Sequence, residues 1–334
     1  MDSVAILGAG AWGTALAMHL LRASPEASVR LWARDAAQAR MLATSRQNVR
    51  YLPGVTLPAA LKVSARLDEA VAGAGLIAIA TPIAALLQVV KALQTISDAP
   101  LVWLSKCFVT TDAAPGVALA HRVVSPRWPA PIGVVSGPSF ADEVARGLPT
   151  AVSVAATDQT VAEAVAQRLR SESLRVYVSD DLTGVEVGGA VKNVLAIAAG
   201  ASDGLGFGHN ARAALITRGL AETGRLSTAL GGRRETLMGL AGLGDLVLTC
   251  TGDLSRNRRV GLALASGKAL PAILAELGHV AEGVTAAQDL RKLTAALGIE
   301  MPICEVVYRV LYQNLPPRRA VEALLAREPG PEFQ

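Results

Sequence analysis

The first half of the chain alternates short apolar, β-branched runs with Ala- and Leu-rich segments of helical spacing. Short apolar runs bounded by turn residues are typical of buried strands. They predict strands at residues 4–7, 29–32, 62–65, 76–80, 101–105, 132–136, 151–155 and 176–178. Helical spacing predicts helices at residues 11–23, 36–45 and 83–93. Because strands and helices alternate, we expect a mainly parallel, doubly wound sheet with helices on both faces.

The pattern changes near Asp180 and Asp181, after which β-branched alternation almost disappears. Long Ala- and Leu-rich stretches of helical spacing follow, broken at glycine clusters in residues 204–208, 231–232 and 242–244. The chain therefore predicts an α/β domain at residues 1–181 followed by an all-α domain at residues 182–334.

One uncharged stretch, residues 70–90, is long enough to cross a bilayer. Gly73, Gly75, the pair Thr81-Pro82 and Gln88 interrupt it. A buried strand, a turn and an amphipathic helix explain this pattern better than a membrane span does.

Composition narrows the function classes. The 334 residues are 51% hydrophobic and 18% charged, which excludes intrinsic disorder. The net charge is only +4 and no block of five like charges occurs, so we expect no nucleic-acid partner. The start of the chain shows no basic leader before its first apolar run, and we expect a cytoplasmic protein.

The cysteines and histidines carry no metal-binding pattern. Three cysteines without a C-x-x-C pair fit a reducing compartment and exclude a disulfide framework; they are Cys107, Cys250 and Cys304. Three histidines show no ligand spacing, so we expect no metal; they are His19, His121 and His279. A fourth, His209, lies at a predicted helix start, where a capping or surface role is favoured over catalysis.

A G-x-G-x-x-G motif follows the first predicted strand and opens a helix. Gly8 suits the tight turn, Gly10 allows close approach of a pyrophosphate, and Gly13 allows the helix to pack on the strand. The helix N-terminus offers free N–H groups to the phosphates. In this position the motif predicts a Rossmann dinucleotide-binding domain.

The choice between the two nicotinamide cofactors is made about 20 residues later in such domains. Arg34 stands there and could pair with a 2′-phosphate, whereas Asp35 could accept ribose hydroxyls instead. Arg34 lies nearer the strand end, which favours NADP(H) and leaves NAD(H) open. A solvated surface ion pair is the alternative for these two residues.

Lys192 is the one lysine in an otherwise apolar, small-residue helical segment. A buried lysine costs free energy unless it is paired or used. Near a substrate carbonyl it could transfer a proton or stabilise a developing alkoxide. The alternative is a lysine that reaches solvent from a helix edge.

Six sequence blocks together resemble bacterial NAD(P)-dependent glycerol-3-phosphate dehydrogenase. They are GPSFADE at residues 137–143, AVKN at 190–193, DGLGFG at 203–208, GLGDL at 242–246, LSRNR at 254–258 and AEG at 281–283. The resemblance runs from Val4 to about Leu325, with the blocks in the same order. It implies reversible conversion of sn-glycerol 3-phosphate into dihydroxyacetone phosphate with a nicotinamide cofactor, supplying glycerophospholipid synthesis.

The resemblance also implies the site residues. Lys192 would be the proton-transfer group. The substrate would contact Lys106, Gly137, Ser139, Lys192, Asp245, Ser255, Arg256 and Asn257. The cofactor would contact Gly8, Gly10, Ala11, Trp12, Gly13, Arg34, Lys106, Ala141, Arg256, Val280 and Glu282. Cys107, where relatives often have glycine, and Ala11, where they often have serine, depart from the pattern.

The residue chemistry agrees with these roles. Arg256 between a serine and an asparagine suits an anion clamp at a helix start, as a phosphate ester requires. Two cations, Lys106 and Lys192, with Asp245 as counter-charge would tune proton transfer. We expect the site between the two domains.

Two alternatives remain open. One is another two-domain NADP-dependent dehydrogenase, of the ketopantoate reductase or hydroxyacid type; the other is a non-catalytic NADP(H) sensor. A sensor would have no reason to keep Lys106, Lys192, Asp245 and Arg256. The apolar residues Val306, Val310 and Leu311 suit a core, or in part a second subunit, so a homodimer is a further expectation.

Overall fold

The computed structural model describes residues 3–278 and 281–326. It divides the chain into two compact units. The first comprises Met1–Val109 and Ala118–Glu186, and the second comprises Thr110–Val117 and Val187–Gln334. The domain limit between residues 181 and 182 stays a prediction.

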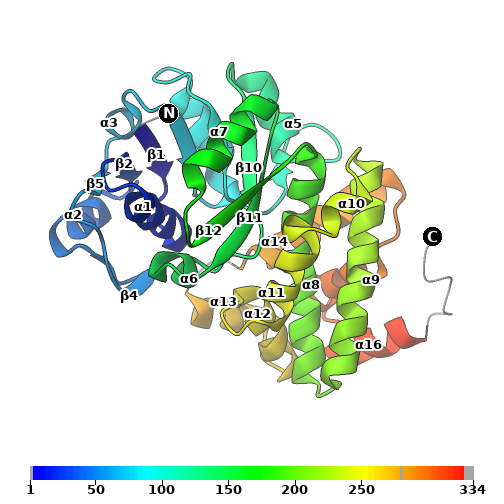
Figure 1. Cartoon of the computed structure of the whole chain (residues 1–334). Helices are drawn as coiled ribbons and strands as arrows, with labels where there is room; N and C mark the ends of the chain where they lie inside the picture. Colours follow the sequence, from blue (N-terminus) through cyan, green and yellow to red (C-terminus); the bar gives the residue numbers. More distant parts are fainter. Residues whose placement is uncertain (1–2, 279–280, 327–334) are drawn as a thin grey trace. The chain divides into compact units, whose positions relative to one another are not determined.

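The first unit is built on an eight-stranded sheet in the order β12-β11-β10-β7-β6-β1-β2-β5 (Figure 1). Its strands are β1 (Ser3–Leu7), β2 (Ser28–Trp32), β5 (Lys62–Ser64), β6 (Leu76–Ile79), β7 (Leu101–Trp103), β10 (Ile132–Ser136), β11 (Thr150–Ala156) and β12 (Leu174–Ser179). Neighbouring strands are parallel, except that β10 and β11 are antiparallel. The predicted mainly parallel sheet is confirmed, and each predicted strand is present with small shifts at its ends.

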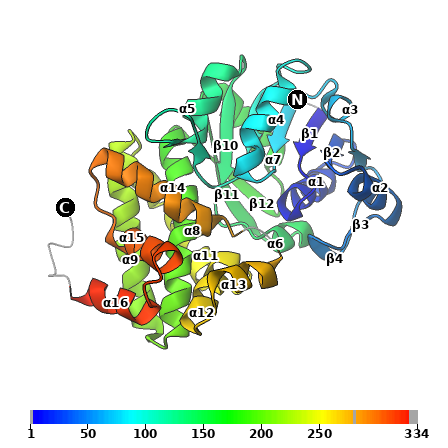
Figure 2. The same ribbon diagram turned by 180° about the vertical axis from the view of Figure 1, so that it is seen from behind.

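Helices cover both faces of this sheet (Figures 1 and 2). They are α1 (Ala11–Ala23), α2 (Ala36–Ser45), α3 (Leu67–Val71), α4 (Leu86–Leu93), α5 (Ala120–Val124), α6 (Ala141–Arg146) and α7 (Gln159–Leu169). Both faces are therefore apolar, and four of the five residues of β1 are buried. The stretch of residues 70–90 forms part of α3, then β6, a 3₁₀ turn at Ile83–Ala85 and part of α4, as predicted.

Two short hairpins were not predicted. One joins β3 (Gln47–Asn48) to β4 (Leu52–Thr56), and the other joins β8 (Val109–Thr110) to β9 (Val117–Ala118). Three of these strands have only two residues, and the fourth, β4, contains a proline and a glycine, so none shows the periodicity of a strand in the sequence.

The second unit is helical, which confirms the predicted change of class. Its helices are α8 (Leu182–Gly204), whose first turn lies in the first unit, α9 (Gly208–Ala229), α10 (Arg234–Leu237), α11 (Asp245–Thr251), α12 (Arg256–Ala265), α13 (Leu270–Leu277), α14 (Glu282–Leu297), α15 (Pro302–Tyr312) and α16 (Pro317–Leu325). The predicted glycine breaks fall at the end of α8, after α9, and in a π-turn at Leu240–Gly244 before α11.

The central helix α8 packs closely against α12. A Cβ atom built on Gly200 would lie 2.0 Å from the Arg258 carbonyl oxygen, and one on Gly261 would lie 2.0 Å from the Ile197 carbonyl oxygen. Only glycine permits backbones to approach this closely. Within the described part of the chain, α8 alone has the length and composition of a membrane span, and 83% of its most apolar window is buried inside the fold.

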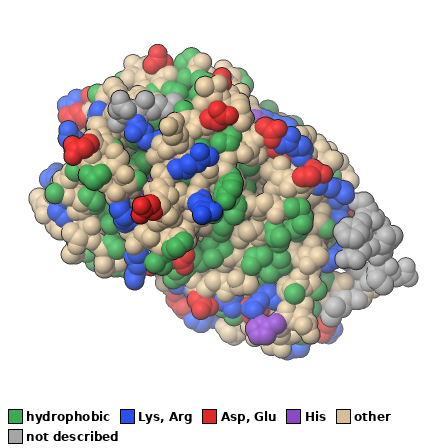
Figure 3. All heavy atoms as spheres, viewed as in Figure 1, with side chains coloured by type: hydrophobic (Ala, Val, Ile, Leu, Met, Phe, Trp, Pro, Cys, Tyr) green, Lys and Arg blue, Asp and Glu red, His purple; other side chains and the backbone are tan. Residues whose placement is uncertain are grey.

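The C-terminal helices pack mainly through their apolar faces. Leu311 is buried in the core, whereas Val306 and Val310 are half-buried and line a small apolar cavity. On the face shown in Figure 3, acidic and basic side chains are interspersed.

Candidate active site

The glycine-rich turn connects β1 to α1 in the first unit. Gly8 has a φ of +119°, and a Cβ on it would lie 2.9 Å from backbone atoms of Ala80 and Thr81. A Cβ on Gly13 would lie 2.0 Å from the Gly8 carbonyl oxygen, so both positions require glycine. Gly10 has nothing within 4 Å of such a Cβ, and no side chain caps α1. The turn therefore leaves an open approach to free N–H groups, which suits a pyrophosphate.

Asn48 braces this turn from the hairpin that was not predicted. Its side chain is fully buried, and its Nδ2 donates to the Ala9 carbonyl at 3.0 Å and to Thr14 Oγ1 at 2.7 Å. Gln38 Nε2 donates to the same carbonyl at 2.9 Å. No local signal marks Asn48, because its partners lie 34 and 39 residues away.

Arg34 and Asp35 differ in what they already bind. Asp35 is the N-cap of α2, and its Oδ1 accepts a hydrogen bond from the Ala37 amide at 2.8 Å. Arg34 is exposed just beyond the end of β2. Both side chains are exposed, but one carboxylate oxygen of Asp35 is engaged in the helix cap, whereas Arg34 has no such contact.

A second group of predicted residues meets beside α1. Trp12 Nε1 donates to the Ser139 carbonyl at 3.0 Å, and Lys106 Nζ donates to the Gly137 carbonyl at 2.9 Å. Ser139 Oγ donates to that Gly137 carbonyl at 2.9 Å. Ala141 follows as the first residue of α6. The structure thus brings together Trp12, Lys106, Gly137 and Ser139 at the carboxyl edge of the sheet.

Three buried hydroxyl oxygens occupy the same edge. Thr81 follows β6, Ser105 follows β7, and Ser136 ends β10. None of the three oxygens has a hydrogen-bond partner among the described residues. A buried polar atom left unpaired costs about 1–3 kcal/mol. Together with the open glycine turn, these atoms fit a polar ligand of dinucleotide type at this edge.

Lys192 belongs to a buried polar cluster in the second unit. Its Nζ lies 2.6 Å from Asp245 Oδ1 and 3.0 Å from Thr249 Oγ1. Lys192 is 8% exposed and Asp245 is 1% exposed. The lysine therefore does not reach solvent from a helix edge; it is buried and paired.

Thr249 is a member of this cluster that the sequence analysis missed. It lies one turn after Asp245 on α11, and its hydroxyl donates to the Asp245 carbonyl at 2.6 Å while accepting from Lys192. The four-residue spacing from Asp245 was the available signal. The neighbouring Cys250 takes no part as a nucleophile, because burial raises the pKa of its thiol to about 12.

The first turn of α12 carries the predicted anion clamp. Ser255 is its N-cap, with Oγ accepting from the Arg258 amide at 3.2 Å, which confirms the predicted helix start. Arg256 is exposed. Asn257 is buried; its Nδ2 donates to Asn193 Oδ1 at 2.9 Å, and its Oδ1 accepts from the Gly283 amide at 3.0 Å.

Asn193 therefore joins the clamp to Lys192, its neighbour on α8. Asn257 acts in the structure as a brace between α8 and the start of α14, and Arg256 is an exposed cation of the turn, as is Arg259. Glu282 is the first residue of α14. Val280 lies outside the described residues.

The remaining predicted residues occupy ordinary positions. Cys107 is buried, and Ala11 is the first residue of α1. His209 is exposed in the first turn of α9, with its Nδ1 2.6 Å from Arg212 Nη2, which fits a surface role. Within the described ranges, no three His, Cys, Asp or Glu side chains are grouped to hold a metal ion.

Comparison with known families gives a consistent result over both units. Residues 3–162 match the model of the NAD-dependent glycerol-3-phosphate dehydrogenase N-terminus. Residues 181–322 match the model of the C-terminus of the same family.

Curated relatives cover nearly the whole chain. Glycerol-3-phosphate dehydrogenase [NAD(P)+] of Aromatoleum aromaticum is 55% identical over 333 residues, covering 98% of this chain and 99% of the relative. That of Methylibium petroleiphilum is 56% identical over 330 residues, covering 97% of each.

Solved structures agree. Glycerol-3-phosphate dehydrogenase of Coxiella burnetii is 43% identical with a TM-score of 0.92, covering 98% of this chain and 99% of that one. A ketopantoate reductase family protein of Ralstonia eutropha is 17% identical with a TM-score of 0.57, covering 96% of this chain and 99% of that one, and it shares the fold alone. Two family models and relatives at more than half identity therefore decide between the alternatives: the chain belongs to the NAD-dependent glycerol-3-phosphate dehydrogenase family of oxidoreductases.

Proposed function

We propose that this protein interconverts sn-glycerol 3-phosphate and dihydroxyacetone phosphate, and so supplies glycerol 3-phosphate for glycerophospholipid synthesis in the cytoplasm. The observation that carries the proposal is the buried Lys192–Asp245 pair, with Nζ and Oδ1 2.6 Å apart, in a chain of this family. Its substrates are small molecules, and no nucleic acid or membrane span is part of the proposal. A homodimer is a further proposal.

A bound nicotinamide cofactor would supply the hydride for reduction of the substrate C2 carbonyl, or accept it in the reverse direction. Gly8, Gly10 and Gly13 would hold its pyrophosphate on the N-terminus of α1, and Trp12, Ala141, Glu282 and Val280 would complete its site. No metal is required, because the lysine performs the electrostatic work that a Lewis acid would otherwise do.

Lys192 would donate a proton to the substrate oxygen as the alkoxide forms, and would accept that proton in the oxidation direction. Asp245 keeps the ammonium form available by pairing with it, and Thr249 fixes the direction in which Nζ points. The ammonium group donates to the carboxylate and to the hydroxyl at the same time, and its third N–H would donate to the substrate oxygen.

The phosphate of the substrate would bind at the start of α12. Arg256 supplies an exposed cation, and Ser255 and Asn257 hold the turn whose N–H groups face the anion. Lys106, with Gly137 and Ser139, would contact the substrate from the first unit. The proposal requires Lys106 and Lys192 to act on one substrate molecule.

NADP(H) is the proposed preferred cofactor, with NAD(H) also used. The support is that one carboxylate oxygen of Asp35 already caps α2, whereas the exposed guanidinium of Arg34 has no such contact and suits a 2′-phosphate.

The test is a steady-state assay of dihydroxyacetone phosphate reduction with NADPH and with NADH. We expect turnover with both and a lower KM for NADPH. Lys192→Ala should lower kcat by about 10²–10⁴-fold while the cofactor Kd changes little, because the lysine acts on the substrate oxygen. Reduction of ketopantoate but not of dihydroxyacetone phosphate, or unchanged kcat in Lys192→Ala, would overturn the proposal.

A further inference from the structure

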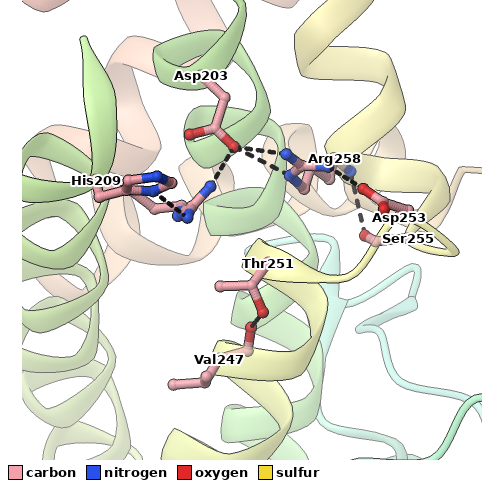
Figure 4. Close-up of polar contacts among 8 residues, drawn as sticks. Asp203, His209, Val247, Thr251, Asp253, Ser255 and Arg258 are labelled. Carbon is pink, nitrogen blue, oxygen red and sulfur yellow. Dashed lines mark hydrogen bonds and ion pairs between the residues drawn. The ribbon is translucent and has the colours of Figure 1, made fainter.

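Asp203, in the DGLGFG block to which the proposed function gives no role, is shared by two arginines (Figure 4). Its Oδ2 accepts from Arg212 Nη1 at 2.9 Å, from Arg258 Nε at 3.1 Å and from Arg258 Nη2 at 2.8 Å. The three side chains are 11%, 19% and 13% exposed, respectively. We call Asp203, Arg212 and Arg258 the Asp203 network; its members come from α8, α9 and α12.

The network joins the helix of Lys192 to the turn that carries Arg256. Asp203 lies eleven residues after Lys192, about three turns along the same side of α8. Arg258 is the third residue of α12, two positions after Arg256. The contact between Asn193 and Asn257 ties the same two helices nearer to Lys192. Two separate ties, with the glycine contacts between them, fix the first turn of α12 along α8.

The hydrogen bonds between Asp203 and Arg258 are of a strong type. A guanidinium that donates two bonds to one carboxylate is held in direction as well as in distance. The carboxylate is mostly buried, so removing its charge leaves two guanidinium groups without their shared counter-charge. Arg258 would then be drawn to its remaining partner, Asp253, whose side chain is 97% exposed.

We propose that Asp203 is a positioning residue for the substrate phosphate. By holding Arg258, it sets the place and direction of the α12 N–H groups and of Arg256, and so sets affinity for the phosphate group without touching the substrate. This inference rests on the proposed function, because it takes the α12 turn as the phosphate site.

The experiment compares Asp203→Asn with the matched control Asp253→Asn. Both replace a carboxylate that bonds to Arg258, but Asp253 is exposed and bonds through Nη1 alone, at 3.0 Å. In Asp203→Asn we expect the KM for dihydroxyacetone phosphate, and the inhibition constant of inorganic phosphate against it, to rise about tenfold, or about 1.4 kcal/mol. The KM for NADPH should stay within about twofold, and Asp253→Asn should match the wild type in all three constants.

A purely structural role for Asp203 predicts a lower melting temperature with both phosphate constants unchanged, or an equal loss for substrate and cofactor; either result overturns the inference. If Asp203→Asn does not fold, the inference is tested with Arg258→Lys. This variant keeps the positive charge but loses the paired Nε and Nη2 hydrogen bonds to Asp203. A higher inhibition constant for phosphate in that variant supports the inference, and an unchanged one contradicts it. Failure of the wild-type protein to reduce dihydroxyacetone phosphate would instead refute the proposed function.

Discussion

Lys192 Nζ and Asp245 Oδ1 lie 2.6 Å apart although 53 residues separate them in the chain. The carboxylate is almost fully buried, and the ammonium group of Lys192 offsets its charge there. Thr249 completes the arrangement from the next turn of α11. The carboxylate and the hydroxyl together hold the ammonium group of Lys192, the proposed proton-transfer group, in one direction.

Thr249 offers a matched pair of variants. Thr249→Val removes the hydroxyl that accepts from Lys192 and keeps the side-chain shape, so we expect kcat to fall by about tenfold, consistent with a lost buried hydrogen bond of about 1–3 kcal/mol. Thr249→Ser keeps the hydroxyl and should remain within about twofold of the wild type. Steady-state rates with saturating NADPH check this. Equal kcat values for the Val and Ser variants would contradict a role for the hydroxyl.

Replacing Gly10 by alanine should weaken cofactor binding without unfolding the protein. A Cβ at this position meets nothing within 4 Å, and its φ of −77° is accessible to alanine. The added methyl group would stand where a pyrophosphate must approach. We therefore expect Gly10→Ala to raise the Kd for NADPH by about tenfold or more with an unchanged melting temperature.

The control for Gly10→Ala lies in the same turn. Ala11→Ser adds a hydroxyl at the first residue of α1 and should leave the Kd for NADPH equal or lower, because a further donor faces the phosphates. Fluorescence titration of both variants measures the two constants. Similar weakening in both would indicate that the turn tolerates no change, rather than that Gly10 contacts the pyrophosphate.

Replacing Arg34 should change the KM for NADPH but not the KM for NADH. Arg34→Ala removes an exposed guanidinium beyond β2, so we expect the KM for NADPH to rise by about tenfold and that for NADH to change little. Arg40→Ala, which removes another exposed arginine from α2, is the control and should change neither constant. A parallel rise for NADPH and NADH in Arg34→Ala would count against recognition of the 2′-phosphate.

The ionisation of Glu222 should make the stability of the protein depend on pH. It lies buried on α9, where it accepts from the Ile303 amide at 2.8 Å and the Cys304 amide at 3.3 Å. Burial raises the pKa of its carboxyl from 4.5 to about 7. The folded state thus holds the proton more tightly, so this contribution to stability is present below pH 4.5 and is lost as the pH rises through about 7.

The change in unfolding free energy across that range is on the order of 3 kcal/mol. Glu222→Gln, which cannot ionise, should abolish it, whereas Glu276→Gln, at an exposed position, should retain it. Urea unfolding at several pH values between 4.5 and 8 is the measurement. If the unfolding free energy of Glu222→Gln depends on pH as that of the wild type does, a group other than Glu222 causes the dependence.

The regular helices and strands could be predicted from the sequence because each depends on the pattern of a few neighbouring residues. β1, the glycine turn and α1 follow from one apolar run and three glycines, and the change to helices after Asp181 follows from the loss of alternation. The antiparallel pairing of β10 with β11 is set by the path of the chain across the sheet, which local periodicity does not record.

The site was accessible only in part. Lys192 stood out as the one lysine in an apolar, small-residue segment, whereas Asp245 and Arg256 were named through the family resemblance. Asn48, Thr249 and the partners of Asp203 could not, because each is defined by what it touches across tens of residues and has no distinctive neighbours in the sequence.

The glycine contact between α8 and α12 limits where this protein can be redesigned. A methyl group at Gly200 or Gly261 would wedge the two helices apart, because carbonyl oxygens already fill that space. The wedge would move Arg256, the proposed phosphate-binding cation, away from Lys192, the proposed proton-transfer group. Engineering of the protein for longer or branched substrates should therefore keep Gly200 and Gly261 and vary the exposed residues of the first turn of α12.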